Sequence, residues 1–195
     1  MSANLVPVDG ELYLYNNFYS KAEADLLFSQ LQTELDWQEE RIFIYGRWVK
    51  VPRLMCWYGN ADACYQYSGV THQPLPWTPT LHIIREKVER QCQCAFNSVL
   101  ANLYRDGNDS MGCHADDEKE LGENPLIASL SLGAPRLFKQ HHKTQPEKLD
   151  MVLSPGDLLL MAGSLQQHWL HSVPKTKKPK TPRINLTFRQ IKMKG

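Results

Sequence analysis

A histidine and an acidic residue separated by one position form the group in this sequence best suited to bind a metal ion. His114 and Asp116 would share one face of an extended strand, because side chains two positions apart point the same way. With one further histidine they would complete the two-histidine, one-carboxylate set that holds iron(II) and leaves coordination positions open. Two candidates, His168 and His171, lie three positions apart on a predicted strand and should point to opposite faces. Only one of them can be the ligand, and periodicity alone does not choose between them.

Zinc is the rival metal, because two histidines and a carboxylate with a bound water also describe a hydrolase site. The polar face of the last predicted strand disfavours zinc, because a keto-dicarboxylate cosubstrate needs its far carboxylate paired with a fixed cation. The planar fork of arginine does this better than lysine. Asn102 and Tyr104 also share a strand face, and a barrel with polar inner faces would gather all of these groups around one cavity. The polar face of the last strand consists of Arg183, Asn185, Thr187 and Arg189.

Two amphipathic helices are predicted in the first half of the chain. Ser20 and Glu23 have the spacing of a capping box, which marks the start of the first helix. Thr78 and Pro79 open the second helix. The apolar residues that follow at helical intervals are Ala24, Leu27, Phe28, Leu31 and Leu35 in the first and Leu81, Ile84 and Val88 in the second.

Short alternating strands dominate the rest of the chain. They are predicted at 96–104, 126–132, 151–153, 157–161, 168–173 and 183–189, with turns such as Asp106-Gly107 and Ser154-Pro155-Gly156 between them. The pattern predicts an α+β fold that is mainly β: a double-stranded β-helix, or jelly roll, buttressed by the N-terminal helices. We expect residues 1–195 to form a single domain, with helices and hairpins over about 18–95 and the jelly-roll core over about 96–191.

The composition excludes several classes of protein. With 195 residues, 42% hydrophobic and 22% charged, the chain fits a folded domain rather than a disordered or fibrous one. It contains no run of about 18 apolar residues and no leader-like start, so we expect an intracellular protein that does not span a membrane, cytoplasmic in a bacterium or nuclear in a eukaryote. A monomer is the default expectation. The five cysteines lack a repeated metal-type spacing, which favours buried, reduced thiols. A net charge of +1 neither indicates nor excludes a nucleic-acid partner, because phosphate binding needs only a local basic face.

Taken together, His114-x-Asp116, the later His171 and the run from Arg183 to Arg189 resemble the AlkB family of iron(II)- and 2-oxoglutarate-dependent dioxygenases. The resemblance extends from about residue 18 to 191 and is closest to the branch that repairs double-stranded DNA. It implies an enzyme that uses iron(II), 2-oxoglutarate and O2 to remove alkyl groups oxidatively from bases such as N1-methyladenine and N3-methylcytosine.

The resemblance also implies a role for each residue around the metal. His171 becomes the third iron ligand beside His114 and Asp116, and Arg189, near the iron-chelating carboxylate of 2-oxoglutarate, completes the catalytic set. The cosubstrate is expected to be bound by Asn102 and Tyr104 as hydrogen-bond donors, Arg183 on its distal carboxylate, and Asn185 and Arg189 in the same network.

On the substrate side, the family pattern implies a flipped base, because a stacked base cannot reach the metal. Tyr45, at an aromatic-glycine hairpin tip, resembles the wedge that enters the duplex. Asp117 and Glu118 resemble the acidic pair that faces the base. The other expected substrate contacts are Tyr65, Tyr67 and Ser68 around the base, Arg53, and Lys177 and Lys178 on the phosphates.

Two departures from that branch leave the polymer open. The wedge is Tyr45 where phenylalanine is usual, and residues 140–145 lack a dense basic loop. RNA or single-stranded DNA therefore remains an alternative substrate, and a catalytically silent nucleic-acid-binding module is the alternative from another class. The remaining histidines have no evident carboxylate partner and are interpreted as surface or packing residues: His72, His82, His141 and His142.

Overall fold

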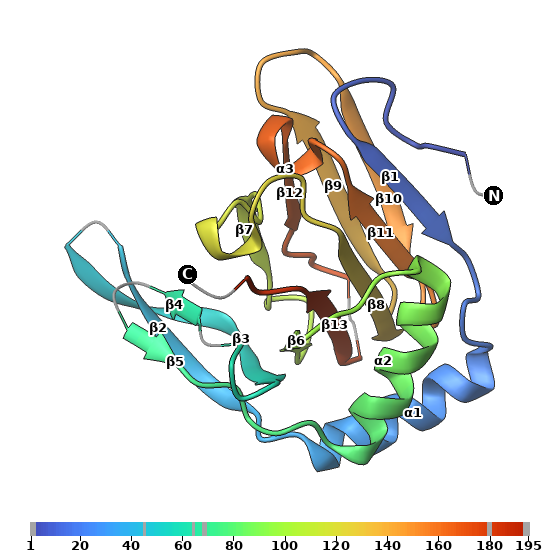
Figure 1. Ribbon diagram of the computed structural model, residues 1–195, viewed down its shortest axis with the longest axis vertical. Coiled ribbons are helices and arrows are strands. Elements are labelled where there is room, and N and C mark those ends of the chain that lie inside the picture. Colours follow the sequence, from blue (N-terminus) through green and yellow to red (C-terminus); the bar gives the residue numbers. More distant parts are fainter. Residues whose placement is uncertain (1–2, 45, 64, 68–69, 179–180, 193–195) are drawn as a thin grey trace.

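Antiparallel strands in two facing sheets form the body of the molecule, and a long hairpin projects from one side (Figure 1). The computed structural model describes residues 3–44, 46–63, 65–67, 70–178 and 181–192. The seven-stranded major sheet has the order β1 (Glu11–Tyr15), β11 (Leu158–Ala162), β8 (Ile127–Gly133), β13 (Arg183–Arg189), β6 (Ser98–Tyr104), β3 (Arg47–Gly59) and β2 (Gln38–Ile44). The four-stranded minor sheet has the order β10 (Lys148–Leu153), β9 (Arg136–His142), β12 (Trp169–Val173) and β7 (Met111–His114).

Two helices cover the outer face of the major sheet. At the start of α1 (Lys21–Glu34), Ser20 and Glu23 form the predicted capping box. The Thr78 side chain accepts a hydrogen bond from the Leu81 backbone N–H at the start of α2 (Pro79–Cys92). Leu31 and Ile84, one from each helix, are fully buried in the cluster that includes the outward-facing side chains of β6, β8 and β13. The helices therefore fix the major sheet from behind and leave its other face to the interior.

The inner face of the major sheet carries polar side chains in register across neighbouring strands. Arg183 of β13 pairs with Tyr104 of β6, and Asn185 pairs with Asn102. The pairing of β3 with β6 places Met55 opposite Asn102. Because the side-chain period of a strand is two, these residues all point between the sheets. A second buried cluster, to which both sheets contribute, closes the interior around them.

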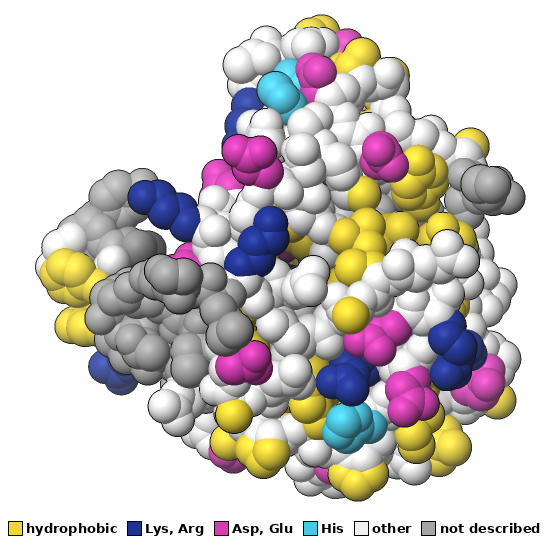
Figure 2. Space-filling view, viewed as in Figure 1, with side chains coloured by type: hydrophobic (Ala, Val, Ile, Leu, Met, Phe, Trp, Pro, Cys, Tyr) yellow, Lys and Arg dark blue, Asp and Glu magenta, His cyan; other side chains and the backbone are white. Residues whose placement is uncertain are grey.

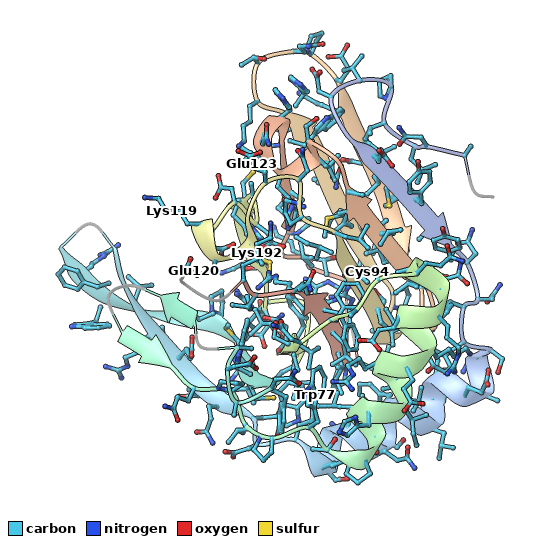
Figure 3. All side chains as sticks on the ribbon, viewed as in Figure 1. Trp77, Cys94, Lys119, Glu120, Glu123 and Lys192 are labelled. Atoms are coloured by element: carbon cyan, nitrogen blue, oxygen red, sulfur yellow. The ribbon has the colours of Figure 1, made fainter. Side chains whose placement is uncertain are left out.

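The remaining elements are short. A two-stranded sheet of β4 (Tyr65–Tyr67) and β5 (Val70–His72) lies beside the long hairpin, and α3 (Leu165–His168) leads into β12. A 3-10 turn, η1 (Lys119–Leu121), contacts the last described residues, where the Lys192 N–H donates to the Glu120 carbonyl at 2.7 Å (Figure 3). None of the helices formed by the described residues is long and apolar enough to cross a membrane.

The predicted jelly roll with its helices is confirmed, and several local predictions were wrong. Strand β9 was not among the predicted strands. Strand β7 ends at His114, so Asp116 lies in the following loop rather than on the same strand. His168 ends α3 and does not belong to β12. The four described cysteines are all free thiols, but only Cys56 is buried and Cys113 is exposed.

Candidate active site

Three potential metal ligands converge at the end of the minor sheet that faces the hairpin. His114 at the end of β7 and His171 in the middle of β12 are cross-strand partners, and their ring centroids lie 4.3 Å apart. Asp116 follows two residues after His114. One ligand atom from each of the three residues lies within 4.8 Å of the others. The arrangement matches a two-histidine, one-carboxylate metal site with open coordination positions.

The surroundings of the three side chains orient His114 and favour the metal-binding protonation states of His171 and Asp116. The Nδ1 of His114 lies 2.9 Å from the Gly112 carbonyl, which can only accept, so Nδ1 donates there and Nε2 is the atom available to a metal. Burial lowers the pKa of His171 to about 4, which keeps this imidazole neutral near pH 7. Burial alone would raise the pKa of Asp116, but Arg189 and the two imidazoles together lower it to about 2. His171 and Asp116 are thus ready to bind a cation without first losing a proton.

Asp116 is oriented from two sides by buried partners. Arg189 donates from Nη2 to Asp116 Oδ1 at 2.7 Å, and both side chains are almost fully buried. Gln166 in α3 accepts the Asp116 backbone N–H at 3.0 Å through Oε1, while its Nε2 points to the sulfur of Met161. Gln166 is only 2% exposed. Sequence reasoning missed this residue, because a four-residue helix carries no periodic signal and its contact spans 50 positions.

We expect the substitution Gln166→Leu to weaken metal binding without removing a ligand. The Asp116 N–H would lose its acceptor, and the loop that carries the carboxylate would be less well fixed. Loss of a residue that hydrogen-bonds a metal ligand, without itself touching the metal, typically costs about 10- to 100-fold in metal affinity. Titration of the apo protein with iron(II) under argon measures the effect, with the exposed Gln167→Leu as the neighbouring control. Equal metal affinity in the Gln166→Leu and Gln167→Leu proteins would contradict this role.

A narrow cavity between the two sheets begins at these ligands. Several polar atoms on its walls are buried and have no hydrogen-bond partner: the Tyr104 hydroxyl, Asn102 Nδ2, and Nε and Nη1 of Arg183. Buried polar groups are nearly always paired, so a run of unpaired donors indicates a ligand that accepts hydrogen bonds. All three residues were predicted to bind the cosubstrate.

Arg183 gives the clearest indication of the charge of that ligand. It is 2% exposed, its Nη2 donates to the Ser131 hydroxyl at 2.9 Å, and its guanidinium lies 5.1 Å from the centre of the Tyr104 ring. Among the described residues, no carboxylate forms a salt bridge with Arg183. Burial lowers the pKa of Arg183, a sign of the cost of an uncompensated buried cation. A dicarboxylate would supply the missing anion.

Asn185 has a different role from the other predicted cosubstrate residues. It borders the cavity, but its Nδ2 donates to the Ser129 hydroxyl at 2.8 Å and to the Leu130 carbonyl at 3.1 Å. Its Oδ1 accepts from the Thr187 hydroxyl at 3.1 Å. Because these bonds occupy its amide, Asn185 orders the floor of the cavity rather than offering a free donor.

A second, larger cavity of about 400 Å³ opens on the other side of the metal ligands, between β3 and β7. His114, Asp116 and Arg189 border both cavities, so the metal site lies between them. Strand β3 borders this cavity with residues 49–53 and, beyond them, with the alternate residues Met55 and Trp57, which share a face with Arg53. This spacing was visible in the sequence, but only Arg53 was predicted; Met55 and Trp57 were missed.

The other predicted substrate residues are placed unevenly. Glu118 borders the larger cavity, whereas Asp117 lies outside it, with its side chain 64% exposed and 3.9 Å from Lys143. Lys177 and Lys178 are exposed in the loop after β12. Tyr45 and Ser68 lie outside the described residues. Tyr65 and Tyr67 belong to β4, and only the backbone of these two residues is described.

Comparison with known proteins identifies the architecture. A model of the 2OG-Fe(II) oxygenase superfamily matches residues 11–189. The chain is 41% identical over 188 residues to the human DNA oxidative demethylase ALKBH2, covering 91% of this chain and 72% of that protein. The chain belongs to the AlkB family of these oxygenases. It is also 39% identical over 188 residues to human alpha-ketoglutarate-dependent dioxygenase alkB homolog 3, covering 91% of this chain and 65% of that protein.

A solved structure has the same fold at lower sequence identity. The structure of OsALKBH1 covers 94% of this chain and 98% of its own, with a TM-score of 0.65 and 20% identity. As an AlkB-family member, the protein is a dioxygenase that uses iron(II), 2-oxoglutarate and O2. The residues present fit these groups, because the three ligands can hold a metal and the unpaired donors beside Arg183 suit a dicarboxylate.

A second histidine cluster in this AlkB-family chain corrects the prediction that His142 lacks a carboxylate partner. Its Nε2 lies 3.1 Å from Asp9 Oδ2, and the ring of His168 stacks on it at 5.9 Å. The Nδ1 of His142 accepts backbone N–H groups from Thr144 and Gln145, so the proton must be on Nε2, where it is donated to Asp9. A metal ion on Nε2 would require that proton to move to Nδ1, which here accepts two backbone N–H groups. The hydrogen bond to Asp9 thus fastens the N-terminal segment to the minor sheet and disfavours a metal ion in this cluster.

Proposed function

We propose that this enzyme removes alkyl groups oxidatively from N-alkylated nucleic-acid bases in DNA, such as N1-methyladenine and N3-methylcytosine, as direct-reversal repair. The observation that carries the proposal is the cavity of about 400 Å³ that ends on the metal ligands. This volume is in the range of small-molecule sites and suits one nucleobase, not a stacked duplex. A base would therefore have to leave the helix to enter it. The names of the relatives, a DNA oxidative demethylase among them, support the same activity.

The residues around the cavity would divide the work between holding the base and holding the cosubstrate. Met55 and Trp57 offer apolar and aromatic surface to a base, and Glu118 offers a negative charge to a cationic adduct. His114, Asp116 and His171 would hold the iron, and Arg183 with Tyr104 and Asn102 would hold 2-oxoglutarate. Held by these residues, iron(II) and 2-oxoglutarate would supply the O2-dependent oxidation that yields succinate and CO2 and hydroxylates the alkyl carbon, and the hydroxylated adduct would release an aldehyde and the restored base. The protein's contribution is placement and charge.

The projecting hairpin supports a polymeric substrate. Figure 2 shows this arm, formed by β2 and β3, standing away from the body and carrying hydrophobic and basic side chains. Phe43 and Trp48 are cross-strand neighbours, 52% and 62% exposed, with ring centroids 5.4 Å apart. Arg41 and Arg47 are exposed on the same arm. Exposed aromatic rings beside guanidinium groups suit unstacked bases and phosphates.

We further propose that the substrate is duplex DNA with a flipped base, with RNA or single-stranded DNA as the alternative. Residues 1–195 would act as a single monomeric domain inside the cell, in the nucleus or the cytoplasm according to the organism. In this arrangement residues of about 18–95 present the nucleic acid to the core of about 96–191.

The direct test is iron(II)-dependent turnover of 2-oxoglutarate on an oligonucleotide carrying one N1-methyladenine, offered as a duplex and as a single strand. We expect succinate to form together with loss of the methyl group, and the ratio of the two rates decides the preferred polymer. Glu118→Gln is expected to slow repair of this cationic base about tenfold, a loss of about 1.4 kcal/mol, with less effect on the neutral N3-methylthymine. No coupled turnover on any methylated strand would contradict the proposed function.

A further inference from the structure

Arg53 joins the two cavities through a single hydrogen bond. Its side chain borders the larger cavity, yet its Nε donates to Asn102 Oδ1 at 2.6 Å. Asn102 is fully buried and borders the narrow cavity on the other side. Its second amide atom, Nδ2, is buried and has no partner. The guanidinium therefore binds the Oδ1 atom of the Asn102 amide, and the Nδ2 atom of the same amide is left for the cosubstrate cavity.

The chemistry of the two groups fixes which way the amide points. An arginine can only donate, so the atom of Asn102 that faces Arg53 has to be the carbonyl oxygen. The NH2 group is then directed away from Arg53. Without the guanidinium, a half-turn about the last side-chain bond would exchange Oδ1 and Nδ2, and Asn102 could present a carbonyl oxygen to an anionic ligand. Arg53 removes that alternative.

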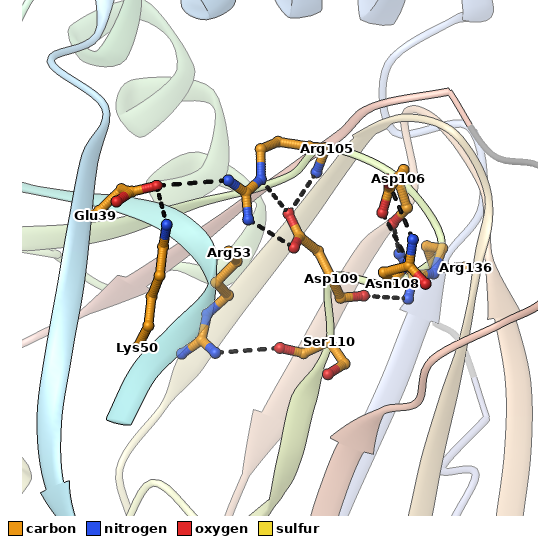
Figure 4. Close-up of polar contacts among 9 residues, drawn as sticks. All are labelled: Glu39, Lys50, Arg53, Arg105, Asp106, Asn108, Asp109, Ser110 and Arg136. Carbon is orange, nitrogen blue, oxygen red and sulfur yellow. Dashed lines mark hydrogen bonds and ion pairs between the residues drawn. The ribbon is translucent and has the colours of Figure 1, made fainter. Parts of the chain in front are cut away.

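Arg53 is itself held in place by its surroundings (Figure 4). Its Nη1 donates to the Ser110 carbonyl at 3.3 Å, and the Ser110 N–H donates to the Pro52 carbonyl at 3.0 Å. The segment before Ser110 is anchored in turn, because Arg105 binds both carboxylate oxygens of Asp109, at 2.7 and 2.9 Å. The guanidinium of this β3 residue is thus bound to Asn102 of β6 and to Ser110, the residue that precedes β7.

We infer that Arg53 is a positioning residue for 2-oxoglutarate: it holds the Asn102 amide with Nδ2 toward the cosubstrate. This goes beyond the substrate contact expected for Arg53 from the sequence. It rests on the part of the proposed function that assigns the narrow cavity to 2-oxoglutarate. It does not depend on the identity of the nucleic acid.

The test measures 2-oxoglutarate affinity by calorimetry with the full chain, loaded with iron(II) under argon and without nucleic acid. Arg53→Met is expected to bind 2-oxoglutarate about tenfold more weakly, the value of one oriented hydrogen bond to a charged group. Arg53→Gln keeps one N–H donor but no charge and is expected to recover part of the loss. Arg90→Met, which removes an exposed arginine of α2, is the control and should bind like wild type.

A double variant separates positioning from direct attraction between Arg53 and the dianion. In an Asn102→Ala background, Arg53→Met should cause no further loss, because the group on which it acts is gone. The same effect can be followed by NMR in protein loaded with zinc, which is not redox-active, in place of iron(II). On addition of 2-oxoglutarate, the ¹⁵N signal of the Asn102 side-chain amide should shift in the wild-type protein and should not shift in Arg53→Met. Wild-type affinity in Arg53→Met, or an equal loss in both backgrounds, would overturn the inference. Failure of base demethylation would leave these binding results unchanged, so the two proposals fail separately.

Discussion

The substitution His171→Ala is expected to abolish iron binding and turnover. His171 is 6% exposed and lies between the ring of His114, at 4.3 Å, and that of Phe138, at 5.4 Å, and alanine would supply no ligand atom in its place. Changes to the partners of metal ligands already cost about 10- to 100-fold in affinity, and loss of a ligand should cost more. Iron(II) content after gel filtration under argon and succinate formation measure both effects.

Two further variants make this result decisive. His171→Phe keeps a ring of similar size in the same contacts, so a folded but iron-free His171→Phe protein would separate the loss of a ligand from the loss of packing. His168→Ala removes the other histidine that the sequence offered as a ligand. Because His168 stacks on His142 in the cluster with Asp9, it should leave iron binding intact. Iron loss in His168→Ala but not in His171→Phe would reverse the assignment.

The substitution Arg183→Met should raise the KM for 2-oxoglutarate by roughly a hundredfold while leaving the apo protein as stable as wild type or more so. Truncating one partner of a buried charge pair costs about 2–5 kcal/mol in binding. In the apo protein, the same change removes a fully buried cation that has a hydrogen bond to Ser131 and no ion pair among the described residues. Replacing such a charge by an apolar side chain is often neutral or stabilising. Succinate kinetics and thermal unfolding without 2-oxoglutarate measure the two effects.

Arg136→Met is the matched control, because the same substitution at this position should destabilise the apo protein. Arg136 is 3% exposed, and its guanidinium donates to the carbonyls of Asp106, Asp109 and Pro174 at 2.7–3.0 Å. Its loss would leave buried acceptors unpaired and should lower the free energy of unfolding by about 2 kcal/mol or more. If Arg183→Met destabilised the apo protein as much as Arg136→Met does, the view of Arg183 as an uncompensated charge would be wrong.

Local patterns in the sequence predicted those elements whose signal lies within a few residues. The capping box of Ser20 and Glu23 and the N-cap at Thr78 are present as predicted. The alternation in β13 correctly placed Arg183 and Asn185 on one inner face. The same search for alternating apolar and polar residues that found β13 missed β9. Three of its four inward residues are polar, so the expected alternation of apolar and polar residues is absent: Arg136, Gln140 and His142 join Phe138 inside.

The sequence by itself determined the types of ligand, the two arginines of the last strand and the jelly-roll class, because each depends on spacing along a helix or strand. Spacing did not decide between His168 and His171; the family resemblance implied His171, and the tertiary structure places it beside His114. That choice depends on where α3 ends and β12 begins, and on the pairing of β12 with β7. The contacts of Gln166 with Asp116, and of Arg53 with Asn102, are likewise long-range, spanning 50 and 49 positions. Hydrogen bonds of this kind leave no period in the sequence, because their partners become neighbours only when β3 pairs with β6 and when α3 packs beside the loop after β7.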